Sequence, residues 1–441
     1  METQRTAALD VLLQVERGGY LGIVLEKRLR HARLNAQERS FVSALCRSVI
    51  ERQLTADHLL RHYLSRPLEK LDAEVRCILR MGVCQLLYFQ SVPARAAVDE
   101  SVRLCAYARK SSAKAFVNGV LRSFLRDNCA IPPCEGDELD RLSVLYSAPR
   151  PLVLLLQEAL GQERAGQLLR QSLEKAPLCI RVNTLRTCAD RLGEALSACG
   201  IGVKRVPLHP DALFLENTGS LAELPAFSQG LFHVQDLICQ LCAQAVDARP
   251  GMRVLDVCSA PGGKSFTMAQ EMEDRGELVC CDIHPHKVEL IRQGAARLGL
   301  HSIIPVVQDA SIYNEKFTKF DRVLCDVPCS GLGILRRKPE IKYKPVEGMA
   351  LLPQLQYKIL ETSAKYCQEG GLLVYATCTL LPQENERLVE RFLGEHPEFS
   401  EAPHPLLGGS WQRTFFPGEQ GDGFFIARIA RRACFGKGAA K

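Results

Sequence analysis

The chain has 441 residues, of which 46% are hydrophobic and 24% are charged. A sequence of this length and apolar content is expected to form about two to four domains with hydrophobic cores, which excludes a disordered or fibrous protein. The net charge of +6 is small but unevenly distributed: residues 1–130 carry 21 basic and 13 acidic side chains, so the positive excess lies at the N-terminal end.

The 19 cysteines favour a reducing compartment over a disulfide scaffold. Disulfide-rich secreted proteins are usually short and begin with a signal peptide, whereas this long chain opens with Met-Glu-Thr-Gln-Arg and has no uninterrupted apolar run of about 18 residues. We therefore expect a cytoplasmic protein without a membrane span. Free cysteines are usually small core residues, and we expect buried, inert thiols at Cys46, Cys77, Cys84, Cys105, Cys199, Cys280 and Cys367.

Residues 1–130 are predicted to form a bundle of helices, because their apolar residues recur at intervals of three and four with almost no strand-like alternation. Residues 131–145 are predicted to be a linker, since the prolines and glycine within them cannot continue a helix. Residues 146–230 are predicted to form a small α+β subdomain. Its expected strands are 179–183, 203–206 and 213–215.

Residues 231–433 are predicted to form an α/β domain, followed by a C-terminal tail at 434–441. From Gly251 onward strand-like and helix-like segments alternate, which is typical of a parallel sheet. The expected strands are 253–257, 277–283, 303–307, 320–325, 371–376 and 423–429. The expected helices are 264–273, 286–298, 352–366 and 383–395.

A glycine-rich turn follows the first of these strands. It reads Cys258, Ser259, Ala260, Pro261, Gly262, Gly263, Lys264. Such a turn lets a ligand approach the backbone and presents free N–H groups at a helix start. An ATP-binding P-loop would need Gly where Cys258 stands, and a dinucleotide turn would need G-x-G-x-x-G, so S-adenosylmethionine remains as the candidate ligand.

Two aspartates support that cofactor. Asp282 ends the second predicted strand, where an acid that binds ribose hydroxyls belongs, and Asp309 ends the third. Each alone is about as well explained as a helix N-cap, for which Asp is favoured. Together with the glycine turn they favour a cofactor site.

Two cysteines lie just beyond buried strands, at the same edge of the predicted sheet. Cys329 follows the fourth strand and Cys378 follows the fifth. A reaction that needs both S-adenosylmethionine and a thiolate is methylation at pyrimidine C5, because a thiolate that adds to C6 makes C5 nucleophilic. Asp326 is placed to hold or protonate the N3 edge of the base. The base must be single-stranded or flipped out of a stack to reach such a site.

A metal site is not expected. Cys239 and Cys242 form a lone C-x-x-C on a predicted helix with no second pair nearby, and the spacing also fits an apolar helix face.

Five segments in order resemble the nucleolar-protein/Sun family of RNA cytosine methyltransferases, in particular its bacterial 16S rRNA cytosine-C5 branch known as RsmB, Sun or Fmu. The matching segments are 258–264, 326–331, 336–342, 377–378 and 421–425. Ser259 and Val327 stand where many members have Ala. The resemblance covers nearly the whole chain and implies a class I, Rossmann-like S-adenosylmethionine-dependent methyltransferase domain.

The resemblance also implies the roles of individual residues. Cys378 of the Thr-Cys pair would be the nucleophile, and Cys329 of the Pro-Cys pair would assist product release. The turn from Cys258 to Lys264, with Asp282, Asp309 and Asp326, would bind the cofactor, and Lys264 would also lie near the base. The implied target is cytosine 967 of 16S rRNA, in naked or early small-subunit RNA.

The basic N-terminal region resembles the RNA-binding antitermination factor NusB, notably at 97–102 and 116–121. The candidate phosphate contacts are Arg5, Arg39, Arg47, Arg122 and Arg126, although a solvated basic face explains each nearly as well. We expect a monomer that binds RNA. Two alternatives remain: a C5 methyltransferase acting on tRNA or 23S rRNA, and a non-catalytic RNA-binding assembly factor.

Overall fold

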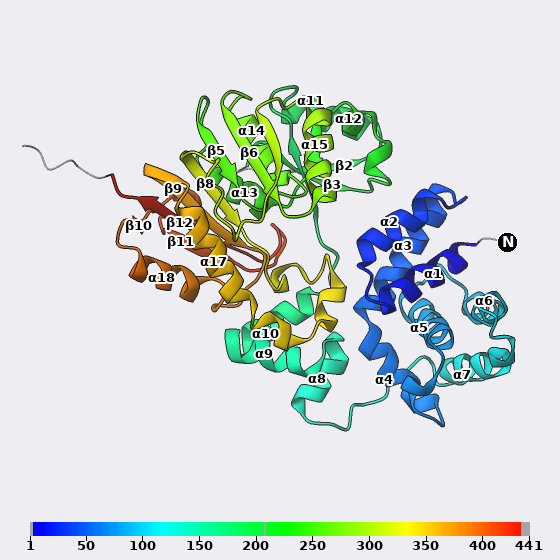
Figure 1. The fold of residues 1–441 in the computed structure, drawn as a ribbon. Coiled ribbons are helices and arrows are strands. Elements are labelled where there is room, and N and C mark those ends of the chain that lie inside the picture. Colours follow the sequence, from blue (N-terminus) through cyan, green and yellow to red (C-terminus); the bar gives the residue numbers. More distant parts are fainter. Residues whose placement is uncertain (1–2, 207–208, 434–441) are drawn as a thin grey trace, which may run out of the picture. The chain divides into compact units, whose positions relative to one another are not determined.

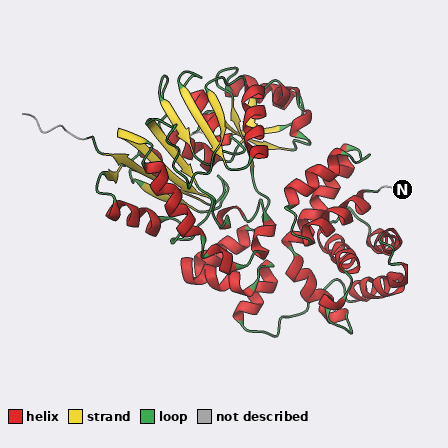
Figure 2. Ribbon diagram, viewed as in Figure 1, coloured by secondary structure: helices red, strands yellow, loops and turns green. Residues whose placement is uncertain are grey.

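A computed structural model describes residues 3–206 and 209–433, which form two compact units. The first unit comprises residues 1–174 and 335–344, and the second comprises 175–334 and 345–441. The first is built from helices alone, whereas the second contains all the strands (Figure 2). The predicted tail at 434–441, which includes Cys434, lies outside the described residues.

The first unit confirms the helical prediction for residues 1–130, but the prediction of a linker at 131–145 is wrong for its second half, because Asp137 caps a helix at Glu138–Tyr146 directly after the prolines and the glycine. Three of its helices begin at capping boxes, in which Thr3, Asn35 and Asp137 each accept a hydrogen bond from the backbone three residues ahead. The helices are α1 Gln4–Glu16, α2 Leu21–Arg30, α3 Ala36–Glu51, α4 Gln53–Tyr63, α5 Ala73–Tyr88, α6 Ala94–Tyr107, α7 Lys114–Arg126, α8 Glu138–Tyr146, α9 Arg150–Leu160 and α10 Gln162–Gln171.

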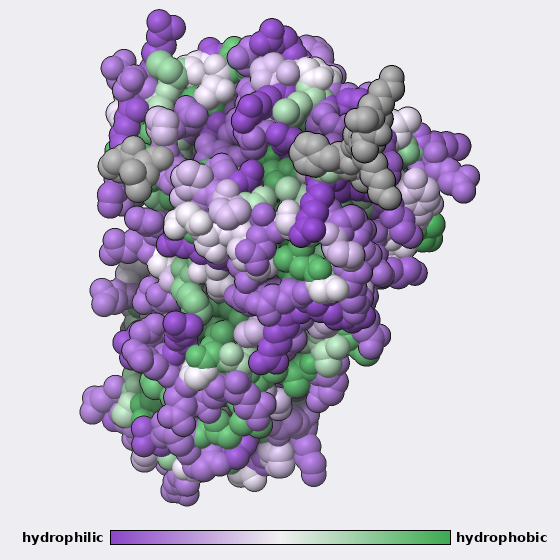
Figure 3. Space-filling view, turned by 90° about the vertical axis from the view of Figure 1, so that its left-hand side faces the viewer, coloured by the Kyte–Doolittle hydropathy of each residue, from purple (hydrophilic) through white to green (hydrophobic). Residues whose placement is uncertain are grey.

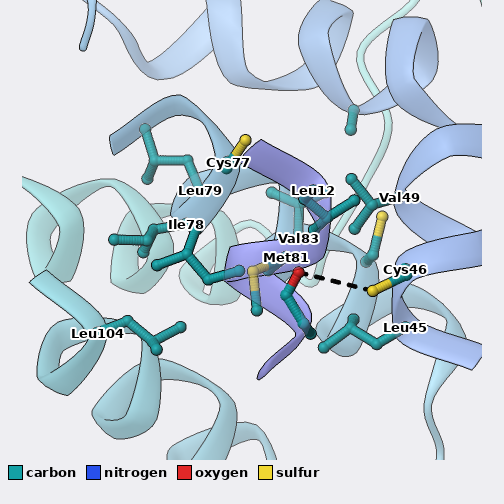
Figure 4. Packing of buried hydrophobic residues seen from close by; sticks show 14 of the residues in the cluster. Leu12, Leu45, Cys46, Val49, Cys77, Ile78, Leu79, Met81, Val83 and Leu104 are labelled. Atoms are coloured by element: carbon teal, nitrogen blue, oxygen red, sulfur yellow. Dashed lines mark hydrogen bonds between the residues drawn. The ribbon is translucent and has the colours of Figure 1, made fainter. Parts of the chain in front are cut away.

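The core of this unit lies between α1, α3 and α5. Figure 4 shows Leu12, Leu45 and Leu79 among the side chains that fill it. Cys46 donates its S–H to the carbonyl oxygen of Ala8 at 3.6 Å, and burial raises the pKa of this thiol far above its ordinary value. The expected buried thiols in this unit are all buried: Cys46, Cys77, Cys84 and Cys105.

The prediction of a buried thiol is wrong for Cys199, which is exposed. It stands just after α11 (Ala189–Ala198), where Gly200 turns the chain with a φ of +79°. A residue at the C-terminal end of a surface helix faces solvent because the chain reverses there rather than packing. Cys280 and Cys367 are buried as expected.

A segment distant in sequence, residues 335–344, belongs to the first unit and includes a short 3₁₀ helix, Pro339–Tyr343. The side chain of Lys342 is fully buried there and donates hydrogen bonds to the carbonyl oxygens of Glu51 (2.9 Å) and Tyr146 (3.2 Å). Burial lowers the pKa of Lys342 to about 7, because the ammonium form loses its hydration. The sequence analysis placed this segment only as a family motif.

The second unit begins with an antiparallel sheet in the order β2-β3-β1-β4. Three of its strands match the predicted ones, and the fourth, only three residues long, was not predicted. The elements are β1 Leu178–Val182, β2 Gly202–Arg205, β3 Ala212–Glu216, β4 Phe232–Val234, α11 and α12 Pro225–Ser228.

An eight-stranded sheet follows, with the order β10-β12-β9-β8-β5-β6-β7 and β11 paired to β12. The strands are β5 Arg253–Asp256, β6 Glu277–Asp282, β7 Ile303–Val307, β8 Phe320–Asp326, β9 Cys367–Thr377, β10 Phe399–Glu401, β11 Gln412–Phe415 and β12 Phe424–Arg431. Strands β5 to β9 are parallel, as predicted. The last predicted strand is antiparallel instead, because the chain passes through β10 and β11 before it returns as β12.

Helices cover both faces of this sheet (Figure 1). Alternate strand residues explain the two layers: Val254 packs into one buried cluster and Leu255 into the other. One layer contains α13 Leu237–Ala245, α14 Gly263–Glu271 and α15 Pro285–Leu298, and the other contains α17 Leu352–Ala364 and α18 Glu386–Glu395. A short helix, α16 Val346–Met349, precedes α17. This is the predicted Rossmann-like arrangement.

Hydrophilic side chains cover much of the face shown in Figure 3, with apolar areas of limited size between them. Among residues 3–206 and 209–433, none of the helices has the length and apolar character needed to cross a membrane.

Candidate active site

The strand order brings the predicted site residues to one edge of the large sheet. Strand β5 lies between β6 and β8, and β8 lies between β5 and β9. Because strands β5 to β9 are parallel, the segments that follow them emerge side by side at the carboxyl ends of the strands. The order reverses between β5 and β8, which is the place where open α/β sheets bind ligands.

The glycine turn joins β5 to α14. Gly262 is the N-cap of α14 and has a φ of +109°, a left-handed conformation that favours glycine. A Cβ there would lie 2.3 Å from the ring of Phe266, so a side chain is also excluded by space. The backbone N–H of Ser259 donates to the carbonyl oxygen of Cys281 at 2.7 Å, which fixes the turn to β6.

A buried hydrogen-bond network supports the turn from below. The Ser265 hydroxyl donates to Oδ2 of Asp256 at 2.6 Å, and it lies 2.7 Å from the hydroxyl of Ser259. Burial raises the pKa of Asp256 to about 7, although the hydrogen bond from Ser265 acts in the opposite direction. Asp256 is thus a structural acid beneath the turn, and the sequence analysis did not single it out.

Lys264 and Asp326 form an ion pair at the centre of the site. Nζ of Lys264 donates to Oδ2 of Asp326 at 2.7 Å and lies 4.8 Å from the centre of the Phe424 ring. Burial, the largest single effect, opposes the charge of the ammonium, but the Asp326 carboxylate is chief among the surrounding groups that together hold the pKa of Lys264 well above its ordinary value. The sequence analysis placed these two residues in the site but did not predict their pairing.

Asp282 and Asp309 lie at the carboxyl ends of β6 and β7. Oδ1 of Asp282 accepts a hydrogen bond from the backbone of His284 at 2.9 Å, and Oδ1 of Asp309 accepts from the backbone and hydroxyl of Ser311 at 2.8 and 2.7 Å. Neither is the N-cap of a helix, since α15 is capped at His284 and no helix begins at Asp309. Ile283 beside Asp282 is 53% exposed.

These residues fit S-adenosylmethionine, the cofactor that the sequence predicts. The N-terminus of α14 offers backbone N–H groups that could hold a carboxylate, because the first turn of a helix leaves its donors free. Asp282 could accept the ribose hydroxyls, and the exposed Ile283 side chain could cover the adenine. The edge of the sheet at the carboxyl ends of β5 to β7 is lined by the turn from Cys258 to Lys264 and by Asp309.

The two strand-end cysteines meet. Their Sγ atoms lie 3.2 Å apart, and both side chains are partly exposed. The hydrogen bond to Cys378, followed by burial, raises the pKa of Cys329 well above its ordinary value. Either sulfur can be the donor of this hydrogen bond.

Five buried residues around these cysteines were missed by the sequence analysis. They hold the two cysteine loops by hydrogen bonds: Ser330, Gln356, Thr379, Glu384 and Asn385. The Glu-Asn-Glu run at 384–386, which follows Cys378 and precedes α18, is a sequence signal for them. The helix predicted at 383–395 includes this run and assigns it no other role.

The C-x-x-C pair lies in α13, with Cys242 buried and Cys239 partly buried. Burial raises the pKa of Cys239 to about 12 and that of Cys242 well above its ordinary value, so both are thiols at neutral pH. Across the two described ranges, no three His, Cys, Asp or Glu side chains are grouped so that they could hold a metal ion.

The candidate phosphate contacts in the bundle divide into two groups. Arg5 donates to the side chain of Gln85, Arg39 to the carbonyl oxygen of Leu34, and Arg47 to the carbonyl oxygen of Arg337.

The remaining two arginines, Arg122 and Arg126, lie on α7 with exposed side chains. Arg126 donates to the nearby hydroxyl of Ser123 at 2.8 Å. They are the better placed for an external ligand.

Three family models match successive parts of the chain. The NusB family matches residues 2–126, a ferredoxin-like domain of RsmF/B-type methyltransferases matches 148–222, and the 16S rRNA methyltransferase RsmB/F family matches 243–430. A solved structure, that of PH0851, has a TM-score of 0.82 at 23% identity and covers 96% of this chain and 97% of its own. At that identity the similarity shows the fold alone.

Two relatives span most of their own length and of this chain. Each is named a probable ribosomal RNA small subunit methyltransferase B. The Bacillus subtilis protein is 35% identical and covers 90% of this chain and 89% of its own. The Synechocystis protein is 32% identical and covers 98% of this chain and 100% of its own. The chain therefore belongs to the S-adenosylmethionine-dependent 16S rRNA methyltransferase RsmB/F family.

Proposed function

We propose that the protein methylates C5 of a cytosine in 16S rRNA, with Cys378 as the nucleophile. The observation that carries the proposal is the 3.2 Å distance between the sulfur atoms of Cys378 and Cys329 beside the Lys264–Asp326 pair. Two thiols and an ion pair at the carboxyl ends of adjacent strands match the needs of C5 chemistry, which requires a nucleophile for C6 and polar groups for the base edge.

Cys378 begins the reaction by adding to C6 of the cytosine. The new bond between sulfur and C6 moves electron density to C5, which is otherwise too poor in electrons to accept a methyl group. In this proposal Cys329 holds the proton of the sulfur–sulfur contact and donates it toward Cys378, which favours the thiolate form of the nucleophile. S-adenosylmethionine supplies the methyl group when it is bound.

Asp326 and Lys264 orient the base. Because its partner is an ammonium group at 2.7 Å, Asp326 acts as a hydrogen-bond acceptor for the exocyclic amino group of cytosine rather than as a proton donor. Lys264 supplies donors for a carbonyl oxygen of the same ring. The pair therefore holds the base against the nucleophile and raises the effective concentration of C6 at Cys378.

Release of the product breaks the bond between Cys378 and C6. A base takes the C5 proton, the C5–C6 double bond forms again, and the sulfur of Cys378 leaves with its electron pair. Cys329 assists by donating its S–H to the departing sulfur. Removal of Cys329 should therefore leave the protein attached to its RNA.

The N-terminal bundle supplies RNA docking in this proposal. The excess of basic side chains in residues 1–130 favours a polyanion as ligand, and that part of the chain matches the NusB family. Arg122 and Arg126 are the bundle residues that we assign to phosphate contacts.

The test uses the full chain, a transcript of 16S rRNA and tritiated S-adenosylmethionine. Cys378→Ala should abolish methyl transfer while cofactor binding, measured by equilibrium dialysis, is retained. Cys329→Ala should accumulate a protein–RNA adduct that survives denaturing electrophoresis. Near-normal turnover by Cys378→Ala would overturn the nucleophile assignment, and an adduct formed by that variant would assign attack to Cys329.

The RNA target is tested separately. Bisulfite sequencing of total RNA from a deletion strain should show the loss of one 5-methylcytosine in 16S rRNA. Loss of the mark from tRNA or 23S rRNA instead would establish another substrate for the same chemistry. No loss from any RNA, and no tritium transfer, would favour a non-catalytic assembly factor.

A further inference from the structure

Two adjacent polar side chains between Cys378 and α18 are completely buried. Glu384 and Asn385 each have a relative exposure of 0%. Burial of a carboxylate or amide is unfavourable unless its hydrogen bonds are satisfied inside the protein. Asn385 occupies the N-cap position of α18, yet its side chain makes no capping hydrogen bond. Helix formation therefore does not explain the orientation of this side chain.

Glu384 holds the loop that carries Cys329. Oε2 of Glu384 accepts hydrogen bonds from the backbone N–H of Ser330 at 3.0 Å and from Nε2 of Gln356 at 2.7 Å. The same Gln356 nitrogen donates to the carbonyl oxygen of Pro328 at 3.0 Å. The residues on both sides of Cys329 are thus fixed by one pair of buried side chains.

Asn385 holds the loop that carries Cys378. Oδ1 of Asn385 accepts a hydrogen bond from the hydroxyl of Thr377 at 2.6 Å, and Nδ2 donates to the carbonyl oxygen of Thr379 at 3.1 Å. The residues on both sides of Cys378 are fixed by a single amide. Each buried residue of the 384–385 pair therefore brackets a different cysteine.

The two loops are also joined to each other. The hydroxyls of Ser330 and Thr379 lie 2.6 Å apart, and the phenol of Tyr375 donates to the backbone carbonyl of Glu384 at 2.7 Å. The distance between the two sulfur atoms is therefore set by a connected network rather than by either loop alone.

We propose that Glu384 and Asn385 are positioning residues for separate steps of the reaction: Glu384 orients Cys329 for release, and Asn385 orients Cys378 for attack. The proposal rests on the proposed function, in which the two cysteines act at opposite ends of one covalent cycle. Neither residue contacts the base. A displacement of about 1 Å in a reacting group can lower a rate by about a hundredfold, so loss of these hydrogen bonds should be visible in the step that each one serves.

The experiment compares Glu384→Gln and Asn385→Asp by the ratio of trapped adduct to methylated product. Glu384→Gln keeps the size of the side chain but replaces the carboxylate oxygen that accepts both hydrogen bonds by a neutral amide oxygen, whose hydrogen bonds are weaker. It should lower turnover by roughly tenfold to a hundredfold and accumulate adduct, as Cys329→Ala does. If Glu384→Gln fails to fold, Gln356→Met is the second variant. It removes the hydrogen bonds that Gln356 donates to Glu384 and to Pro328, and it should also lower turnover and accumulate adduct.

Asn385→Asp keeps the acceptor for Thr377 but loses the donor to Thr379. It should lower turnover without accumulating adduct. In a Cys329→Ala background it should reduce the amount of adduct by roughly tenfold or more, because attack precedes trapping. Both variants should keep cofactor binding.

Glu271→Gln is the matched control. Glu271 is a partly buried carboxylate of the same unit that pairs with Arg181 and contacts neither cysteine loop. It should change neither turnover nor the adduct ratio. Equal ratios of adduct to product in wild type, Glu384→Gln and Asn385→Asp would overturn the proposal. A residue with a purely structural role should lower the amounts of adduct and of methylated product together. If Cys329→Ala itself traps no adduct, the proposed function fails instead.

Discussion

Removal of the Asp326 carboxylate should destabilise the second unit by leaving Lys264 as a buried cation without its partner. The Nζ–Oδ2 distance is 2.7 Å, and the two side chains are 13% and 26% exposed. With an effective dielectric constant of about 20, the attraction at that distance is about 6 kcal/mol, and desolvation of both groups offsets part of it. Loss of one partner of a buried pair typically costs 3–5 kcal/mol, and the partial exposure of Asp326 places the expected loss near 3 kcal/mol.

Asp326→Asn tests this by calorimetry on the full chain. A loss of about 3 kcal/mol in a unit of this size should lower its melting temperature by roughly 6–12 °C. Glu277→Gln is the matched control, because Glu277 pairs with Arg253 at 2.8 Å on the surface, where both side chains are more than one-third exposed. It should lower the free energy of unfolding by less than about 1 kcal/mol.

The double variant Lys264→Met/Asp326→Asn decides the cause. If a buried, unpaired ammonium group is what destabilises Asp326→Asn, the double variant should be more stable than that single variant. A double variant that is less stable than Asp326→Asn would refute the reasoning. Methyl transfer should be low in both, since both lack the pair that orients the base.

Three further predictions concern other parts of the molecule. The pKa of Lys342 is lowered from 10.5 to about 7, so the unfolded chain binds this proton more tightly and the contribution of Lys342 to the stability of the first unit should rise with pH between these values, by as much as about 5 kcal/mol. The difference in unfolding free energy between wild type and Lys342→Met, measured with denaturant at pH 7 and 10, should shift toward wild type by that amount, because the buried thiols that lower stability above about pH 9 are common to both proteins. Oxidation with diamide should join Cys329 to Cys378, because their sulfur atoms lie 3.2 Å apart; activity should be lost and then restored by dithiothreitol, and peptide mapping that found either cysteine in a different disulfide would contradict the site geometry. Replacement of Arg122 and Arg126 by Gln should weaken RNA binding and reduce the slope of log affinity against log salt by about 1–2, and an unchanged slope would place the docking surface elsewhere.

Local sequence patterns predicted most of the elements and the residues that the structure brings together at one edge of the sheet. Alternating strand and helix patterns after Gly251 predicted the parallel sheet, and the glycine turn could be placed because a tight turn before a helix needs a residue such as Gly262 that tolerates a positive φ. Cys329 and Cys378 could be singled out because parallel strands end at one edge of a sheet. Their common position after a strand therefore implied proximity.

Local patterns failed where side-chain partners are distant in sequence. Lys342 is a basic residue in a stretch rich in basic residues, which suggests a solvated segment. It is instead buried in the helical unit, where it donates to the carbonyl oxygens of Tyr146 and Glu51, 196 and 291 residues away in the sequence. Arg5 and Arg47 were candidates for phosphate contact for the same compositional reason. Hydrogen bonds within the first unit occupy them instead.

The sequence by itself determined most of the succession of helices and strands, the glycine turn and the place of Cys329 and Cys378 at strand ends, because these depend on periodicity and on residue types at strand ends. Only the tertiary structure decided that Lys264 pairs with Asp326, and that Glu384 and Asn385 each bracket one cysteine. These contacts depend on strand order and on the path of the loops. Both are set by packing of the whole sheet, which no local pattern encodes.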